Sequence, residues 1–200
     1  MNAFTTASGL PVPLVEDNID TDIIIPSREI TSVGKEGLAD GLFAGRRYRH
    51  DRNPDPAFVI NDPRYAGSPI LLGGANFGCG SSREAAVWAL REYGFQVVIA
   101  PSFNPIFKRN CVRNFVLPAL ADAGAIAATQ APVTVDLAAR QIRAETGEIW
   151  TFQIEEEAAA MLLSGRDEID FTLSQADAIQ FWREADRRQR AWAYLPGAAA

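Results

Sequence analysis

The chain has 200 residues, of which 48% are hydrophobic and 22% are charged, and its formal net charge at pH 7 is −6. This length and apolar content suit a single large domain with a sizeable core. The acidic balance argues against a nucleic-acid partner, which would require basic patches, and the longest apolar run is too short to span a membrane.

The first third of the chain predicts little regular structure. We expect a strand over residues 12–15, a polar turn over 18–22, and an apolar run over 23–25 that ends at Pro26. Residues 27–55 are rich in glycine and charge, a composition that rarely packs in a core, and they are too many for a simple connection. The stretch at about 27–55 is therefore predicted to be a mobile lid or substrate-contacting loop. A short strand over residues 58–60 follows.

The middle of the chain alternates between strands and helices. Strands are predicted over residues 69–72, 97–100 and 115–117. A helix is expected from about Ser82 to Tyr93, where Gly94 ends it, and another from Asn104-Pro105 to about Arg113. This order predicts an α/β fold with right-handed parallel crossovers.

The last third predicts an antiparallel sheet followed by helices. Strands are expected over residues 133–137, 141–144 and 149–154, with a turn at 146–147. Helices are expected over 155–163 and, at the C-terminus, over about 174–194, before a frayed tail at 195–200. Because neither an internal repeat nor a clear linker is visible, residues 1–200 are predicted to form one domain.

Residues 73–90 read GGANFGCGSSREAAVWAL and carry the strongest functional signal. Ser81 and Glu84 have the spacing of a capping box, and a helix that begins there directs unpaired backbone N–H groups at the loop. Arg83 adds a planar group that can hold a carboxylate through two hydrogen bonds. These residues predict a small-anion site with two hydroxyls in reach. A glycine-rich turn with a good helix cap explains the same pattern equally well.

Two cysteines, Cys79 and Cys111, and one histidine, His50, limit the chemistry. An iron–sulfur cluster normally needs three or four thiolates, so this chain is not expected to bind one alone. A zinc site is also disfavoured, since His50 lies in the basic run over residues 46–51, RRYRHD, which we expect to be solvated. No serine-hydrolase elbow is present. The cysteine count and the absence of a signal-peptide pattern predict a cytoplasmic protein.

Three ordered motifs carry a family resemblance. The loop sequence NFGCGSSRE resembles the active-site loop of the 3-isopropylmalate dehydratase (isopropylmalate isomerase) small subunits, within the aconitase superfamily. Residues 17–28, DNIDTDIIIPSR, are similar to the N-terminal signature of that family. Residues 93–103, YGFQVVIAPSF, resemble its strand and turn after the loop. The likeness covers nearly the whole chain.

The resemblance implies a swivelling β/β/α domain, which is the mobile fourth domain of aconitase as a separate chain. It implies the small subunit of a heteromeric hydro-lyase that isomerises 2-isopropylmalate and 3-isopropylmalate through isopropylmaleate in leucine biosynthesis. The expected partner is a large subunit that carries a [4Fe-4S] cluster. The expected substrate is a branched malate-type dicarboxylate, and no cofactor or metal is expected on this chain.

The same resemblance assigns the candidate site residues. Ser81 matches the serine that serves as the catalytic base, and Ser82 and Arg83 match its substrate-binding neighbours. Arg28 is the candidate for a second substrate carboxylate. The supporting residues are Asp20, Thr21, Asp22 and Gly80. Purely structural interpretations stay open: a helix cap for Ser81, an ion pair with Glu84 or Glu92 for Arg83, and an Asx turn for the signature.

The sequence departs from the family pattern after the arginine of the loop. Relatives continue with His, Ala, Pro and Trp, whereas this chain has Ala85, Ala86, Val87 and Trp88. We expect this departure to tune a site that it adjoins. Leu38, Leu42 and Phe43 are candidates to sense the substrate's alkyl branch. Two alternatives stay open: a dehydratase for citraconate/methylmalate or dimethylmalate, and an anion-binding regulatory module.

Overall fold

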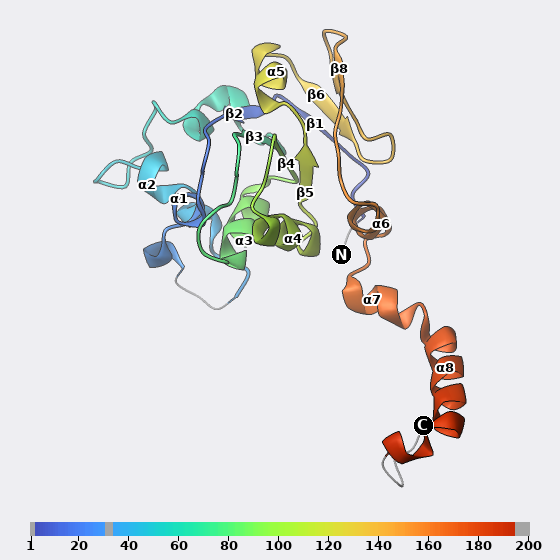
Figure 1. The fold of residues 1–200 in the computed structure, drawn as a ribbon. Helices are drawn as coiled ribbons and strands as arrows, with labels where there is room; N and C mark the ends of the chain where they lie inside the picture. Colours follow the sequence, from blue (N-terminus) through green and yellow to red (C-terminus); the bar gives the residue numbers. More distant parts are fainter. Residues whose placement is uncertain (1–2, 31–33, 195–200) are drawn as a thin grey trace. The chain divides into compact units, whose positions relative to one another are not determined.

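The computed structural model describes residues 3–30 and 34–194, and Figure 1 shows the fold. Two compact units are present, Met1–Gly165 and Arg166–Ala200. The first unit contains two four-stranded sheets. The prediction that residues 1–200 form one swivelling domain with a mobile 27–55 loop stays a prediction.

A parallel sheet forms the centre of the first unit, with the strand order β2-β3-β4-β5. Its strands are β2 (Val12–Leu14), β3 (Ile70–Gly73), β4 (Val97–Ala100) and β5 (Leu117–Leu120). Two helices make the crossovers, α3 (Glu84–Tyr93) between β3 and β4 and α4 (Pro105–Arg113) between β4 and β5. This arrangement confirms the predicted α/β fold with parallel crossovers.

The second sheet is antiparallel, with the order β1-β6-β7-β8. Its strands are β1 (Thr6–Gly9), β6 (Val133–Asp136), β7 (Gln141–Ala144) and β8 (Ile149–Thr151). The three predicted strands of this region are therefore confirmed as antiparallel. The helices α5 (Ala123–Ala128) and α6 (Glu156–Ser164) belong to the same half of the unit.

The parallel sheet is buried on both faces, which explains its continuous apolar strands. Within β3, Leu71 faces a core with α3 and α4, whereas Ile70 and Leu72 face the core of the antiparallel sheet. Val98 and its neighbour Ile99 of β4 divide in the same way between the two cores. The period-2 geometry of the strands thus separates the unit into a helical layer, a central sheet and an outer sheet.

Residues 27–55 differ from their prediction in one respect, the packing of side chains in the core, whereas their mobility stays a prediction. They contain the short helix α2 (Ala44–Arg47) and 3₁₀ turns at Ser27–Glu29 and Ala39–Gly41. Leu38, Leu42 and Phe43 are fully buried in the core beneath α3. The expectation that this stretch stays out of the core was wrong, because a few apolar side chains pack inward from a segment whose average composition is polar. Residues 31–33 of the predicted loop lie outside the described residues.

Several smaller predictions were also wrong or shifted. The strand expected at 58–60 is a 3₁₀ turn, Val59–Asn61, followed by another at Pro63–Tyr65. The strand expected at 115–117 begins at Leu117. The helix α4 was predicted well, since Asn104 accepts from the N–H groups of Ile106 and Phe107 at 3.0 and 3.4 Å.

The second unit consists of α7 (Glu168–Leu173), α8 (Ala176–Gln189) and a 3₁₀ turn at Ala191–Ala193. The predicted C-terminal helix at about 174–194 is thus present, with a shorter regular part. None of the residues of α8 is buried. The tail predicted at 195–200 lies outside the described residues. No helix in the described part of the chain is long and apolar enough to cross a membrane.

Candidate active site

The N-terminal signature and the glycine-rich loop lie side by side, although about sixty residues separate them in sequence. Both follow the carboxyl ends of neighbouring parallel strands, because β2 pairs with β3 and places Leu14 opposite Gly73. Their pairing continues past the strand ends through four backbone hydrogen bonds of 2.7–3.1 Å. These bonds join Gly74 to Glu16, Asn18 to Ala75, Gly78 to Ile19, and Thr21 to Cys79.

The segment after β4 holds the other side of the loop. The Asn76 N–H donates to Ser102 Oγ at 2.7 Å, and the Phe77 N–H donates to the Ser102 carbonyl at 3.0 Å. The loop is thus fixed between two segments at the carboxyl edge of the sheet, where open α/β folds bind their ligands. The motif at residues 93–103 therefore supports the loop.

The glycines of the loop permit close approach of other chain segments. A Cβ atom on Gly74 would lie 2.3 Å from the backbone of Glu16. Gly78 has φ +74°, and a Cβ there would lie 2.1 Å from the Phe107 ring. Gly80 has φ +86°, and its Cβ would meet Asp20 at 3.3 Å. The glycine pattern is therefore required by packing against the signature and α4.

Thr21 and Asp20 were predicted to be supporting residues of the site. The Thr21 side chain is 2% exposed, and its Oγ1 donates to the Ser81 carbonyl at 2.9 Å. Asp20 Oδ1 accepts from the Ile23 N–H at 2.7 Å and caps the short helix α1 (Thr21–Ile24). The structural interpretation of Asp20 as a capping turn is thus correct, and Thr21 connects that turn to the loop.

The predicted capping box is wrong. The helix α3 begins at Glu84, its N-cap is Arg83, and no side chain caps it. Ser81 lies outside the helix, where its carbonyl accepts from the Arg83 N–H at 2.8 Å. Glu84 instead accepts from Asn114 Nδ2 at 2.7 Å. The extended backbone of Arg83 (φ −111°, ψ 103°) separates the serine from the first helical turn.

Ser81 and Ser82 are both exposed. Neither hydroxyl forms a hydrogen bond with another residue in the described part of the chain. The Ser81 main chain is fixed by two donors to its carbonyl, whereas its hydroxyl is open to solvent. Such a hydroxyl is available to a ligand.

Arg83 forms an ion pair with Asp22 of the signature. Ser27 Oγ also donates to Asp22 Oδ1, at 3.3 Å. The hydrogen bond from Arg83 is the main reason that the pKa of Asp22 lies below its usual value. The alternative partners suggested by the sequence, Glu84 and Glu92, bind other groups. The structure thus brings a predicted binding residue and a predicted supporting residue into direct contact.

Arg28 is 69% exposed at the side chain and lies 3.5 Å from the carboxylate of Glu29. It lines an open hollow of about 490 Å³ together with Asp22, Ser27 and Arg46. Arg46 was not among the predicted site residues. It comes from the basic run that the sequence indicated as solvated, and its guanidinium pairs with Glu16 Oε2 at 2.6 Å. The hollow connects Arg28 to Asp22 and hence to Arg83.

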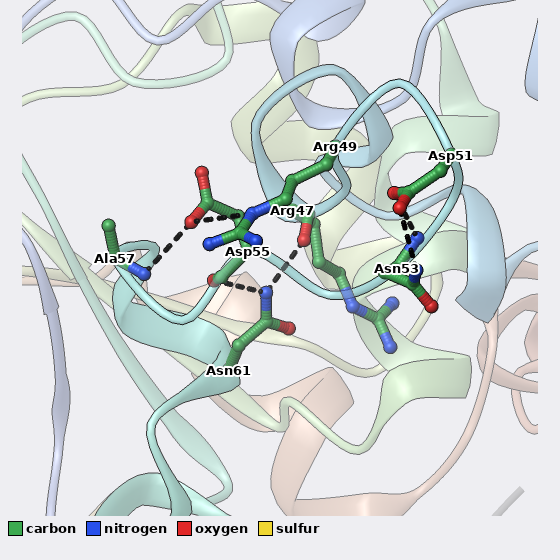
Figure 2. A network of polar contacts seen from close by, with 7 residues as sticks. All are labelled: Arg47, Arg49, Asp51, Asn53, Asp55, Ala57 and Asn61. Atoms are coloured by element: carbon green, nitrogen blue, oxygen red, sulfur yellow. Dashed lines mark hydrogen bonds and ion pairs between the residues drawn. The ribbon is translucent and has the colours of Figure 1, made fainter.

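The remainder of the basic run is a structured turn, as Figure 2 shows. Asn61 Nδ2 donates to the carbonyls of Arg47 and Asp55 at 2.7 and 2.9 Å. Asp51 accepts from the backbone and side chain of Asn53 at 3.1 and 2.7 Å. His50 is exposed in this turn. The backbone of this turn is held largely by Asn61, whereas Arg46 and Arg47 bind groups outside the run, the Glu16 carboxylate and the Ala39 carbonyl.

The part of the chain that the structure describes contains no group of three His, Cys, Asp or Glu residues placed to hold a metal ion. Cys79 is half-buried and Cys111 is buried, and both are free thiols. Burial raises the pKa of the Cys111 thiol. The donor set of the described residues does not fit an iron–sulfur cluster.

Ala85 and Val87, the predicted departures from the family pattern, face the core beneath α3, with 8% and 0% of their surface exposed. Both positions lie in the first turn of α3, directly after its N-cap Arg83. That this departure tunes the adjoining site stays a prediction.

Comparison with known proteins gives a consistent result. Residues 1–123 match the family described as the aconitase C-terminal domain. The 3-isopropylmalate dehydratase small subunit of Cupriavidus necator is 49% identical over 98% of this chain and 100% of that protein. The protein of the same name from Nitrobacter hamburgensis is 41% identical over 96% of this chain and 100% of its own length.

A solved structure agrees with these relatives. The crystal structure of 3-isopropylmalate dehydratase from Methanocaldococcus jannaschii is similar to this chain, with a TM-score of 0.67 and 27% identity. The match covers 89% of this chain and 99% of that one. The predicted fold, the fourth domain of aconitase, is thereby confirmed.

Proposed function

The chain belongs to the family of 3-isopropylmalate dehydratase small subunits, and on that premise we propose that residues 80–83 and the N-terminal signature form its part of the active site. The chain is the small subunit of a hydro-lyase that isomerises isopropylmalate in leucine biosynthesis. The contact between Thr21 and the Ser81 carbonyl is the observation that best supports this site, because it joins the two motifs of this chain that carry the family resemblance.

Ser81 is proposed as the general base. Dehydration of a malate removes a weakly acidic proton next to a carboxylate, and this step needs a base in a fixed position. The Ser81 backbone is held by Thr21 and Arg83, while its hydroxyl faces solvent. An unassisted hydroxyl is a poor base, so nearby positive charge and hydrogen-bond donors must stabilise its alkoxide form. Arg83 is the cation that the loop itself supplies.

Arg83 and Arg28 are proposed to bind the two carboxylates of the substrate, with Ser82 as a hydrogen-bonding neighbour. A guanidinium has five N–H donors, and Asp22 is bonded to Arg83 Nη1. A substrate carboxylate can therefore take the remaining donors or displace Asp22. Arg28 has an exposed side chain on the hollow shared with Asp22, which suits a second carboxylate. Asp20 and Gly80 support the backbone of this arrangement.

The larger partner subunit is proposed to carry the [4Fe-4S] cluster, which this chain has too few cysteines to hold alone. The name of the relatives, small subunit, implies such a partner. When bound, the cluster would supply the Lewis acid that the departing hydroxide needs. The steps assigned to this chain are proton removal and binding of the carboxylates. The complete active site therefore forms only between subunits.

The proposed substrate is the 2-isopropylmalate and 3-isopropylmalate pair, reacting through isopropylmaleate. Dehydratases for citraconate/methylmalate or dimethylmalate are the competing assignment. The family match over nearly the full length favours an enzyme subunit over an anion-binding regulatory module. We propose no nucleic-acid or membrane partner. A cytoplasmic location is proposed as well, since both cysteines are free thiols.

A substrate panel tests this function. The chain would be combined with its larger subunit, and kcat/KM measured for 3-isopropylmalate, methylmalate and dimethylmalate. We expect the highest value for 3-isopropylmalate, by at least about tenfold, since each methylene in a fitted pocket contributes roughly 1–3 kcal/mol. A higher kcat/KM for methylmalate or dimethylmalate would show that the chain belongs to a dehydratase for that smaller malate.

A further inference from the structure

Glu92, near the end of α3, holds a remote segment by its backbone. Its carboxylate accepts three backbone N–H groups, those of Gly37 at 2.6 Å, Leu38 at 2.5 Å and Ala39 at 2.9 Å. One oxygen receives the Gly37 donor, and the other receives the remaining two. Leu38 is fully buried beneath these bonds. The end of the segment that follows the N-terminal signature is therefore fixed to α3.

A cation from α2 completes the attachment. Arg47 Nη1 donates to the Ala39 carbonyl at 2.8 Å, and its guanidinium lies 4.8 Å from the ring centre of Tyr93. The carboxylate of Glu92 thus holds the N–H groups of residues 37–39, while Arg47 holds a carbonyl of the same turn. Both attachments converge on the last turn of α3.

A second contact places Lys35 across the same helix. Lys35 Nζ lies 5.5 Å from the ring centre of Trp88 and 3.4 Å from Asn114 Oδ1. Asn114 is 1% exposed and also binds the Trp88 indole N–H and the Glu84 carboxylate. Because Glu84 directly follows Arg83, the network extends from Lys35 to the first turn of the helix that the proposed site precedes.

The charge state of Glu92 suits this contact. Burial alone would raise the pKa of Glu92, but the three backbone donors outweigh burial and hold the pKa below its usual value. The group is therefore a carboxylate at neutral pH. Hydrogen bonds to an ionised acceptor are the stronger kind.

We infer that Glu92 is a positioning residue for the dehydratase: by fixing residues 37–39 it holds the turn that ends at Gly41, and this turn packs closely against Glu29, the neighbour of Arg28. The inference rests on the proposed function, in which Arg28 and Arg83 bind the two substrate carboxylates. A backbone that is already fixed beside Arg28 loses less conformational freedom when substrate binds. Releasing the turn at residues 37–39 should therefore raise KM, while the proton-transfer step at Ser81 changes little.

The test uses Glu92→Gln and Glu92→Ala in the assembled enzyme. Glutamine keeps one acceptor oxygen for two of the donors but places an amide N–H₂ opposite the third. We expect KM for 3-isopropylmalate to rise about two- to tenfold, the cost of ordering one more flexible group on binding. We expect kcat to stay within about twofold and Glu92→Ala to have the larger effect. Glu157→Gln, which removes an exposed carboxylate from α6, is the matched control.

Hydrogen exchange of the isolated chain gives a readout that does not depend on the proposed function. The amides of residues 37–39 should exchange roughly ten- to hundredfold faster in Glu92→Ala, as expected for loss of hydrogen bonds to a charged group. Amides of β4 should be unchanged. Faster exchange with an unaltered KM would contradict a role in substrate binding. Unaltered exchange would contradict the attachment itself.

Two further outcomes separate this inference from the proposed function. If Glu92→Gln lowers both kcat and the thermal stability while it raises KM, Glu92 has a general structural role, and the inference is overturned. If Ser81→Ala keeps normal turnover, the proposed catalytic site is wrong. The Glu92 variants would still be judged by exchange and by KM in an active enzyme.

Discussion

At the scale of single residues, Ser81 shows how a main chain is fixed while a side chain stays available. Thr21 Oγ1 and the Arg83 N–H both donate to the Ser81 carbonyl, at 2.9 and 2.8 Å. Ser81 is not the cap of α3. The effects of a mutation on helix stability and on catalysis can therefore be separated at this position.

Ser81→Ala should reduce turnover without reducing stability. Losing a general base typically costs roughly 10²–10⁴-fold in rate. Replacing an exposed serine that caps no helix should change the free energy of unfolding by less than about 0.5 kcal/mol. The measurements are kcat of the assembled enzyme and urea unfolding of the isolated chain. Near-normal kcat would remove Ser81 from the chemistry, and a clear loss of stability would restore its capping role.

Arg83→Lys should raise KM by about tenfold or more, because an ammonium cannot reproduce the planar fork that binds a carboxylate. The charge is retained, so the change tests geometry and not net charge. Steady-state kinetics of the assembled variant is the measurement. Unchanged KM and kcat would show that Arg83 does not contact the substrate.

The ion pair between Arg83 and Asp22 also predicts a pH dependence. Arg83 lowers the pKa of Asp22, so the pair stabilises the folded state at pH values above 3.8, the pKa of Asp22 in the unfolded chain. This stabilisation is lost as the pH falls through the lower pKa that Asp22 has in the folded state. Between about pH 5 and pH 8, kcat/KM should show no inflection from Asp22. An inflection in that range that disappears in Asp22→Asn would contradict this assignment.

At the scale of elements, the site depends on how three loops meet at one edge of the parallel sheet. The segment after β2, the glycine-rich loop after β3 and the segment after β4 are joined by backbone hydrogen bonds. Strand pairing sets their register, since Leu14 lies opposite Gly73. The position of the Ser81 loop therefore depends on close approach of backbones, which glycine permits.

Gly78→Ala should destabilise the first unit more than Gly67→Ala. Both glycines have φ +74°, so an alanine at either position meets the same backbone strain. A Cβ on Gly78 would lie 2.1 Å from the Phe107 ring, whereas nothing lies within 4 Å of one on Gly67. The difference should be about 1–3 kcal/mol, the usual cost of overpacking, as measured by denaturant unfolding. Equal losses of unfolding free energy for the two variants would mean that the Phe107 ring of α4 does not clash with a side chain at position 78.

The elements that could be predicted have local signals. Asn104-Pro105 identified the beginning of α4, and β-branched residues identified β4 over Val97–Ala100. The capping box of Ser81 and Glu84 was an equally local signal, yet it failed. Thr21, sixty residues away, holds the serine main chain outside the helix. Local patterns cannot report a hydrogen bond of that kind.

The site could be predicted as a set of residues but not as a geometry. The motifs named Asp22 and Arg83 without indicating that they form an ion pair across 61 positions. Leu38 and Leu42 were assigned to a substrate loop because the composition of residues 27–55 is polar on average. Burial depends on where individual side chains point, and that is decided by packing under α3. The attachment at Glu92 has no sequence signal, since its partners are backbone groups.

At the scale of the whole molecule, one active site is proposed to be divided between two subunits. The proposed contribution of this chain is a serine, two arginines and a loop held by backbone hydrogen bonds, at the edge of a sheet that is buried on both faces. Its described residues do not include ligands for a metal cluster. The proposal therefore requires that neither subunit catalyses the reaction alone.

Reconstitution tests this claim most directly. The isolated chain and its purified larger subunit would be assayed for 3-isopropylmalate dehydration under anaerobic conditions, separately and after mixing. We predict no turnover from either protein alone, and turnover from the mixture that saturates as this chain is added. Iron-dependent turnover by the isolated chain, or full activity of the larger subunit without it, would contradict the account.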